Sequence, residues 1–323
     1  MISFLIRRFI SLGFLLFFVS ILVFFLLWLS PGDFLAEASI RPDIPESFIE
    51  EMRQNYGLDK PWYIQYLIWV KNAITLDFGH SMSYNIPVMD LIAQRLPATF
   101  LLSCTSMLFV WSIAIPLGIL AAIKQDSWFD KTSRFLASIT MSIPEFLLAV
   151  LLLYLIARTG VLPIGGLTSV NHEFLSPIEK ILDYLHHLIL PTLVLGTVGI
   201  SGMMRVMRAN FMDYMREDFV RTARAKGLPE GTIMFKHVLR NAINPLITSF
   251  GFAFSSLLSG SLLVEKVLNF PGLGLLIFDS FMKEDQYVVM ASILMSCTML
   301  VFGNLLADIL LAWTDPRIRS SAK

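Results

Sequence analysis

The sequence predicts an all-α integral membrane protein with six transmembrane helices and with both termini in the cytoplasm. The first reason is composition. Of the 323 residues 55% are hydrophobic, Phe alone accounts for 26, and only 15% are charged, against about 25% charged residues in ordinary soluble domains. The second reason is that apolar runs long enough to cross a bilayer recur along the chain. The third is that Lys and Arg gather between these runs, mostly on one side of the membrane.

The membrane spans follow from length, because roughly 20 apolar residues cross a bilayer as a helix. Phe9–Leu29 contains no charged residue and is the first predicted span. A cleaved signal peptide is the alternative, with Arg7 and Arg8 as its basic start and Ala36–Ala38 as its cleavage site. Its apolar region would exceed the usual length of about 7–15 residues. Further spans are predicted at Ala98–Ile123, Phe135–Ala157, Leu188–Met204, Ile243–Val264 and Val288–Trp313.

The loop charges predict the orientation and the domain organisation. With the N-terminus in the cytoplasm, 16 of the 25 Lys and Arg residues lie inside and nine lie outside, as the positive-inside rule requires. The prediction is a multi-pass protein of the cytoplasmic (inner) membrane, surrounded by membrane lipid and with no nucleic-acid partner. Residues 1–97 form the first helix and a long external loop. Residues 98–323 form a core of five helices, in which the small residues of Gly196–Gly202 permit close helix packing.

A charged stretch, "EDFVRTARAKGLPEGTIMFKHVLRNAINPL" at Glu217–Leu246, dominates the cytoplasmic loop at about residues 205–242. From Asn210 to Lys226, basic residues alternate with apolar ones as on an amphipathic helix. Gly227 supplies a left-handed residue that ends this helix, and Pro229 starts a second helix that continues into the membrane. The two helices meet at a glycine elbow. Its composition is compatible with an exposed face that binds either lipid headgroups or a groove on a partner protein.

Two features predict a translocation path. In the segment that joins the last two spans, Pro271, Gly272 and Gly274 break any continuous helix, while the apolar residues around them favour re-entry into the bilayer. Irregular backbone at that depth is tolerated where it is buried in protein or lines a watery cavity. Glu145 follows Pro144 inside the third span, and an acid within the membrane is by default a functional candidate. A helix–helix hydrogen bond beside the proline kink is the alternative for Glu145.

No metal site is predicted. His172, His186 and His187 lie in or beside an external loop, but their spacing is not that of a helix-borne zinc site. We expect them to be surface or interfacial residues, and contact of His186 and His187 with a metal-bearing substrate is the alternative. Cys104 and Cys297 are far apart in apolar runs and are expected to be unreactive buried thiols.

The elbow also carries a family resemblance. "RTARAKG" at Arg221–Gly227, followed by "RNAINP" at Arg240–Pro245, resembles the cytoplasmic signature loop of permease subunits of binding-protein-dependent ABC importers. Ala223, Gly227 and Leu239 match the general signature. Arg221, Thr222, His237 and Arg240 depart from it in the way typical of the dipeptide, oligopeptide and nickel branch. Landmarks of that branch occur in order along the chain as "LIRRFI", "YGLDKPWYIQYLIW", "DFGHS", "RLPAT", "SIPEF", "HLILPTLVL", "FPGLG" and "DPRIR".

The resemblance implies a type I importer permease fold that moves dipeptides or oligopeptides from an external binding protein into the cytoplasm. Nickel or metallophore import is one alternative, and a membrane scaffold or sensor without transport is another. The implied partners are a second homologous permease, two ABC ATPase subunits and an extracytoplasmic substrate-binding protein. The ATPase-coupling loop would comprise Arg221, Thr222, Ala223, Arg224, Ala225, Lys226, Gly227, Leu228 and Pro229.

The energy source is expected on the partners. The chain contains no Gly-x-x-x-x-Gly-Lys-Ser/Thr loop, the motif whose backbone amides cradle nucleotide phosphates. The sequence therefore predicts a pore-forming subunit that is not itself an enzyme and binds no cofactor, with ATP and Mg held by the ATPase subunits.

Overall fold

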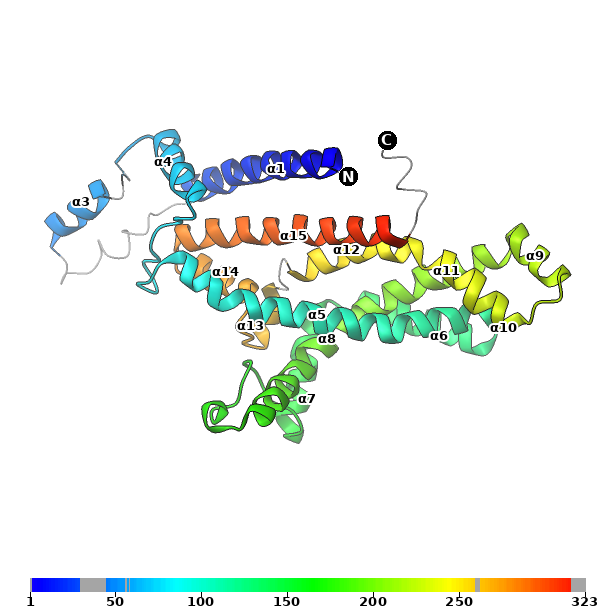
Figure 1. The fold of residues 1–323 in the computed structure, drawn as a ribbon. Helices are drawn as coiled ribbons and strands as arrows, with labels where there is room; N and C mark the ends of the chain where they lie inside the picture. Colours follow the sequence, from blue (N-terminus) through cyan, green and yellow to red (C-terminus); the bar gives the residue numbers. More distant parts are fainter. Residues whose placement is uncertain (1, 30–44, 56, 58, 259–261, 315–323) are drawn as a thin grey trace. The chain divides into compact units, whose positions relative to one another are not determined.

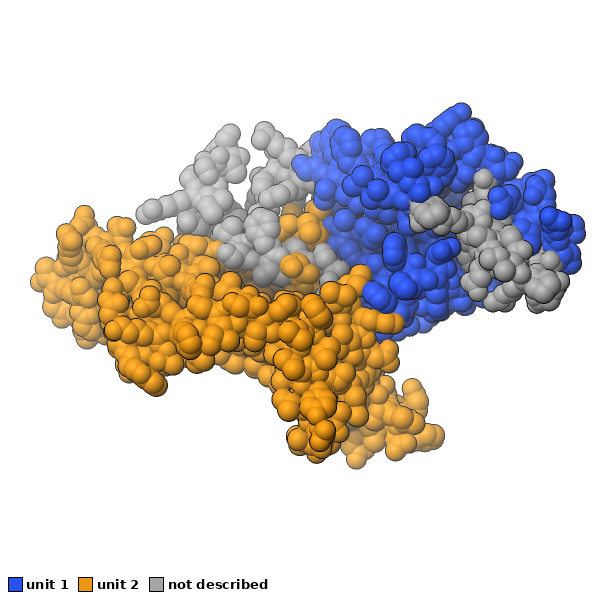
Figure 2. Space-filling model, turned by 180° about the vertical axis from the view of Figure 1, so that it is seen from behind, with its two compact units in different colours: residues 1–98, 271–299 blue, residues 99–270, 300–323 orange. Residues whose placement is uncertain are grey.

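The computed structural model describes residues 2–29, 45–55, 57, 59–258 and 262–314. The signal-peptide cleavage site considered at 36–38 and the C-terminal landmark at 315–319 lie outside these residues. The described chain is helical apart from loops and one isolated β-bridge between His80 and Pro87 (Figure 1). It forms two compact units, residues 1–98 with 271–299 and residues 99–270 with 300–323 (Figure 2). Each unit is described by itself.

The first unit packs α1 against α4. Ser20 Oγ lies 2.9 Å from the hydroxyl of Tyr66, and the rings of Phe24 and Tyr66 meet edge to face at 5.5 Å. This contact fastens the segment after the first span onto the first span itself. The unit contains α1 (Ile2–Leu29), α3 (Glu46–Asn55), α4 (Trp62–Ile74), the start of α5 (Val88–Ile123), α14 (Leu273–Met282) and the first half of α15 (Gln286–Thr314).

A buried carboxylate joins distant parts of the first unit. Asp285 has no exposed surface and lies in the turn between α14 and α15. It accepts hydrogen bonds from Ser81 Oγ at 2.6 Å and from the backbone N–H of Ser83 at 3.1 Å. A buried charge is costly unless it is paired or hydrogen-bonded, so these donors fix the loop before α5 onto the turn before α15.

The second unit is built around α8. Met207 and Phe211 on α8 are fully buried, in a cluster with residues from α5, from α6 and from the segment after α8. Gly118 of α5 permits the close approach, because a Cβ there would lie 2.7 Å from Met207 and 2.9 Å from the backbone oxygen of Met204. The predicted close packing at Gly196 is confirmed, since a Cβ there would clash with the ring of Phe109.

The remaining helices of this unit follow in chain order. They are α6 (Trp128–Ser142), α7 (Glu145–Thr159), the 3-10 turn η1 (His172–Phe174), α8 (Pro177–Met215), α9 (Asp218–Ala225), α10 (Glu230–Thr232), the π-helical segment η2 (Ile233–Val238), α11 (Leu239–Ala242), α12 (Asn244–Leu258) and α13 (Leu262–Val267). With 39 residues and a rise of about 1.5 Å per residue, α8 exceeds the bilayer core of about 30 Å.

Four described helices are long and apolar enough to cross a membrane: Ile10–Leu29 of α1, α5, α8 and Gln286–Leu306 of α15. The predicted continuous span Phe135–Ala157 is wrong. It is two helices, α6 and α7, bent by 97° at Ile143 and Pro144. Proline disfavours the helical conformation of the residue before it, and Ile143 is extended. Counted as one broken span, this pair makes five.

Candidate functional site

The predicted elbow lies after α8, at the end of the second unit where Figure 1 shows α9 and α10 together. Its entry differs from the prediction of one helix from Asn210 to Lys226. The chain instead ends α8 at Met215 and begins α9 at Asp218, because Glu217 is extended (φ −67°, ψ 151°) and acts as the N-cap residue. The break lets α9 leave the direction of α8.

Gly227 forms the corner of the elbow. Its φ of +73° is left-handed, a conformation that costs an L-residue with a side chain roughly 1–2 kcal/mol. The N–H of Gly227 bonds to the carbonyl of Arg224, and the N–H of Leu228 bonds to the carbonyl of Ala223. These bonds close α9, and Pro229 then stands as N-cap of α10. The predicted turn at Gly227 between two helices is therefore confirmed.

The inner face of the elbow is buried in the protein's own core. Val220 and Ile233 have no exposed surface, and Ala223 is 7% exposed. They pack in one cluster with Met207 and Phe211 of α8. Because this apolar stripe is already covered by protein, it is not available to insert into lipid. The elbow is therefore anchored in the helical core through its inner face.

The outer face mixes cations with apolar side chains. The side chain of Arg221 is 76% exposed, and its contact to Asp218 is long at 3.4 Å. Lys226 is also exposed. Phe219, Leu228 and Phe235 are exposed by 37%, 38% and 62%. Exposed apolar residues with a basic rim are typical of a protein-docking surface.

Arg224 has a different environment from Arg221. Its Nε lies 2.6 Å from Oε1 of Glu230, so the pair joins α9 to α10 across Gly227. The hydrogen bond from Arg224 lowers the pKa of Glu230, and the same bond raises the pKa of Arg224. From the sequence, Arg221 and Arg224 are expected to play the same part in the coupling loop. The structure separates them, because Arg224 braces the elbow and Arg221 faces outward.

The second helix of the elbow is interrupted. A π-helical segment, Ile233–Val238, follows α10, and α11 ends at Ala242. The next helix, α12, begins at Asn244 and has Pro245 in its first turn, where a missing N–H breaks no helical bond. The predicted second helix is therefore not regular throughout, because it contains a π-helical segment and is broken at Ile243, and Pro245 lies at the start of α12.

The sequence did not reveal a buried ion pair beneath the elbow. Asp130 of α6 is fully buried, and Arg208 of α8 donates to both of its oxygens, from Nε at 2.6 Å and Nη2 at 2.7 Å. Arg134 lies 3.4 Å away, and the backbone N–H of Asp126 donates at 3.0 Å. Such bidentate charge-assisted pairs are strong and directional. The sequence signals only the local part of this site, the helix start. Ser127 is the N-cap residue of α6, and its side chain accepts a hydrogen bond from the Asp130 N–H.

The candidate path residues fall in different units. Pro144 is the N-cap of α7, and Glu145 is in its first turn and exposed. Pro271 lies in the loop before α14, and Gly272 is the N-cap residue of α14. The prediction that Gly274 breaks the helix is wrong, since Gly274 is buried inside α14. Because each unit is described separately, convergence of these residues stays a prediction.

Two of the three histidines are not surface residues. His172 and His187 are 9% and 8% exposed. Nδ1 of His172 lies 2.7 Å from Oδ2 of Asp183, and Nδ1 of His187 lies 2.8 Å from the backbone oxygen of Asp183. Only His186 is exposed as expected. Within the described residues no group of three or more His, Cys, Asp or Glu side chains is arranged to hold a metal ion.

Comparison with known proteins supplies the family. The family "Binding-protein-dependent transport system inner membrane component" matches residues 114–320, and the N-terminal component of the same kind of membrane protein matches residues 1–103. The chain is 40% identical over 320 residues to the oligopeptide transport system permease protein AppB of Bacillus subtilis, covering 98% of this chain and 99% of AppB. It is 39% identical over 319 residues to the glutathione transport system permease protein GsiC of Escherichia coli strain K12, covering 99% of each chain.

A solved structure agrees in fold. A chain of the inward-facing MetNI methionine ABC transporter superposes with a TM-score of 0.57 at 16% identity, covering 70% of this chain and 97% of that one. At this identity the likeness concerns the fold, which is that of an ABC importer permease. The chain therefore belongs to the family of inner membrane components of binding-protein-dependent transport systems, as a multi-pass permease subunit whose ATPase resides on partner subunits.

Proposed function

We propose that this chain is a permease subunit that imports peptides by alternating access, driven through the elbow by partner ATPases. The observation that carries the proposal is the two-sided elbow. Its inner residues Val220 and Ile233 are buried in the core, while Arg221 and Leu228 are exposed. A segment that transmits force must be firmly packed on its inner face and accessible to the partner on its outer face. Alternating access then requires that its displacement reach the spanning helices.

The cargo follows from the two named relatives. AppB is named for oligopeptide transport and GsiC for glutathione transport, and glutathione is itself a short peptide. Both relate to this chain over nearly its whole length. Peptide import is therefore preferred to nickel or metallophore import, and transport is preferred to a scaffold or sensor role.

The proposed assembly has this chain paired with a second homologous permease. Two ABC ATPase subunits, which bind ATP and Mg, would dock on the cytoplasmic elbows, and an extracytoplasmic binding protein would deliver the peptide. We further propose the six-span type I arrangement, with residues 1–97 as the peripheral first helix and external loop. Residues 98–323 would form the permease core, in which α12 and α13 together complete the span that neither makes alone.

The contacts of α8 suggest how motion is transmitted. Val220 and Ala223 of α9 pack in one cluster with Phe211 of α8, so displacement of α9 would move α8. One helical turn before Phe211 on α8, Arg208 binds Asp130 of α6. A push on the elbow would thus reach α6 and the bend that leads into α7.

Glu145 and the segment around Pro271 remain the proposed substrate path. Glu145 stands at the start of α7, just beyond that bend, and no hydrogen bond to another described residue occupies its carboxylate. We propose that it faces the amino group of a peptide in one state of the cycle. Glu145→Gln should then weaken uptake of peptides with a free amino terminus more than uptake of N-acetylated ones. Equal loss for both would instead favour the helix–helix contact.

Co-purification tests the docking role. The complex with all its partners is extracted in mild detergent, and Gly227→Pro is compared with wild type. Proline cannot adopt φ of +73° and lacks the N–H that bonds to Arg224. The second permease should remain bound while the ATPases are lost. Gly231→Ala is the matched control, because α10 leaves open space at that Cβ without a left-handed backbone. Full ATPase recovery with Gly227→Pro would contradict the docking assignment.

A further inference from the structure

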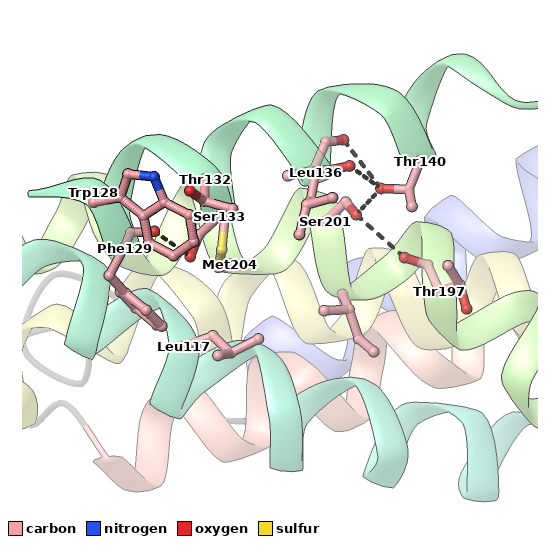
Figure 3. Close-up of a pocket in the computed structure, with 12 residues that line it drawn as sticks. Leu117, Trp128, Phe129, Thr132, Ser133, Leu136, Thr140, Thr197, Ser201 and Met204 are labelled. Carbon is pink, nitrogen blue, oxygen red and sulfur yellow. Dashed lines mark hydrogen bonds between the residues drawn. The ribbon is translucent and has the colours of Figure 1, made fainter.

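A groove along α6 and α8 is used by neither the elbow nor the proposed path (Figure 3). Its volume is about 380 Å³. It extends along α6 from Trp128 to Thr140, which is about 18 Å at a rise of 1.5 Å per residue. Apolar side chains form most of its walls, among them Leu117 of α5, Leu136 of α6, and Ile200 and Met204 of α8.

Four of the five hydroxyl groups that line the groove already have hydrogen-bond partners. Figure 3 shows Thr140 bonded to Ser201 across the two helices and to the backbone of its own helix. Ser133 donates to the carbonyl of Phe129, and Thr197 donates to the carbonyl of Leu193. No ionised side chain lines the groove. An occupant therefore gains little from hydrogen bonds to the groove. A peptide would leave its backbone N–H and C=O groups without partners there, which costs considerable free energy.

Two lysines lie near one end of the groove. Trp128, which is 81% exposed, marks that end beside the turn joining α5 to α6. Lys124 lies in this turn, and Lys131 lies one helical turn beyond Trp128. Arg205 of α8 does not belong to this end, because it donates to Ser138 Oγ at 2.6 Å, two residues from Thr140 at the other end of the groove. In the described part of the chain neither lysine is paired with a carboxylate.

We propose that this groove binds a phospholipid with an anionic headgroup. One acyl chain lies along α6 and α8, and the phosphate lies beside Lys124 and Lys131 at the Trp128 end. Basic pockets between transmembrane helices on the cytoplasmic side recognise anionic lipids in this way, and exposed Trp is typical of the membrane interface. The inference goes beyond peptide import and depends only on the predicted orientation. Because α8 leads into the elbow, a bound lipid also stiffens the helix through which the ATPase would act.

Photolabelling of the complete complex in proteoliposomes tests the proposal. The probe is phosphatidylglycerol with a diazirine on one acyl chain, compared with phosphatidylcholine that carries the same diazirine. Mass spectrometry locates the labelled peptides. We expect residues 128–140 and 197–204 to be labelled, and labelled more strongly by phosphatidylglycerol. The double variant Lys124→Gln with Lys131→Gln should reduce this preference by about fivefold for each cation removed.

Two further variants separate the groove from the general lipid-facing surface. Ile200→Trp fills the groove and should abolish its labelling. Leu147→Trp, on the exposed face of α7, is the matched control and should leave it unchanged. Size-exclusion chromatography verifies that each complex is assembled. Equal labelling by both probes, or groove labelling unaltered by Ile200→Trp, would overturn the proposal. A cross-link from a photoreactive residue at position 136 to the second permease would do the same.

Discussion

Asp130 shows how much a single side chain contributes to the helical core. The carboxylate is fully buried and is held by Arg208 and Arg134. Removing one partner from a buried pair typically costs about 3–5 kcal/mol, because the other charge is left uncompensated, whereas replacing both is much less harmful. The sequence could not reveal this pair, since its members are 78 residues apart and each resembles an ordinary loop charge.

Disruption of this pair should be strongly asymmetric. Arg208→Gln should destabilise the permease by about 3 kcal/mol or more, measured as denaturant unfolding in detergent micelles. The double variant Asp130→Asn with Arg208→Gln should recover much of the loss. Lys131→Gln, an exposed neighbour, should be nearly neutral. If the double variant were as unstable as the sum of its single variants, the two residues would not act as a pair.

At the scale of elements, the elbow depends on its corner and its brace. Gly227 sets the turn, and Arg224 joins α9 to α10 through Glu230. The pKa of Glu230 is lowered by this bond, so the pair is fully formed above the ordinary carboxyl pKa and is lost as pH falls through the lowered value. Both residues are exposed, and salt will screen them.

A charge exchange distinguishes the brace from the docking surface. Arg224→Glu places two carboxylates across Gly227 and should reduce ATPase binding, while adding Glu230→Arg should restore it. Arg221→Glu should reduce ATPase binding in a salt-dependent way and should not be restored by Glu230→Arg. Affinity measured by fluorescence anisotropy of a labelled ATPase, at two salt concentrations, gives the comparison. Restoration of both variants, or of neither, would contradict the separate roles.

Close packing of α5 on α8 is the second feature of elements. Gly118→Ala would place a methyl group 2.9 Å from the backbone oxygen of Met204, and backbone yields less readily than a side chain. Overpacking of this kind typically costs about 1–3 kcal/mol, which thermal unfolding in detergent should report. Gly202→Ala on α8 is the control, since a Cβ there meets nothing within 4 Å. Equal stability of the two variants would show that the helices can separate without cost.

At the scale of the whole molecule, α8 is long and apolar enough to connect the two sides of a membrane. Near its start Asp183 holds His172 and His187, and near its end Arg208 holds Asp130. The apolar runs and the glycine corner were predictable, because both are local properties of the sequence. The break at Pro144 was predicted only as a kink, although its cause is also local. The Asp130–Arg208 pair joins residues 78 positions apart, so no local pattern could predict it.

The most direct test of the account is the coupling ratio of the reconstituted complex. ATP-dependent uptake of a labelled oligopeptide into proteoliposomes is measured together with ATP hydrolysis, for wild type, Gly227→Pro and Gly231→Ala. The account predicts that wild type and Gly231→Ala accumulate peptide at the same cost in ATP, and that Gly227→Pro abolishes uptake and its link to hydrolysis. Peptide uptake by Gly227→Pro at the wild-type ratio would contradict the central claim that this elbow couples ATP hydrolysis to transport.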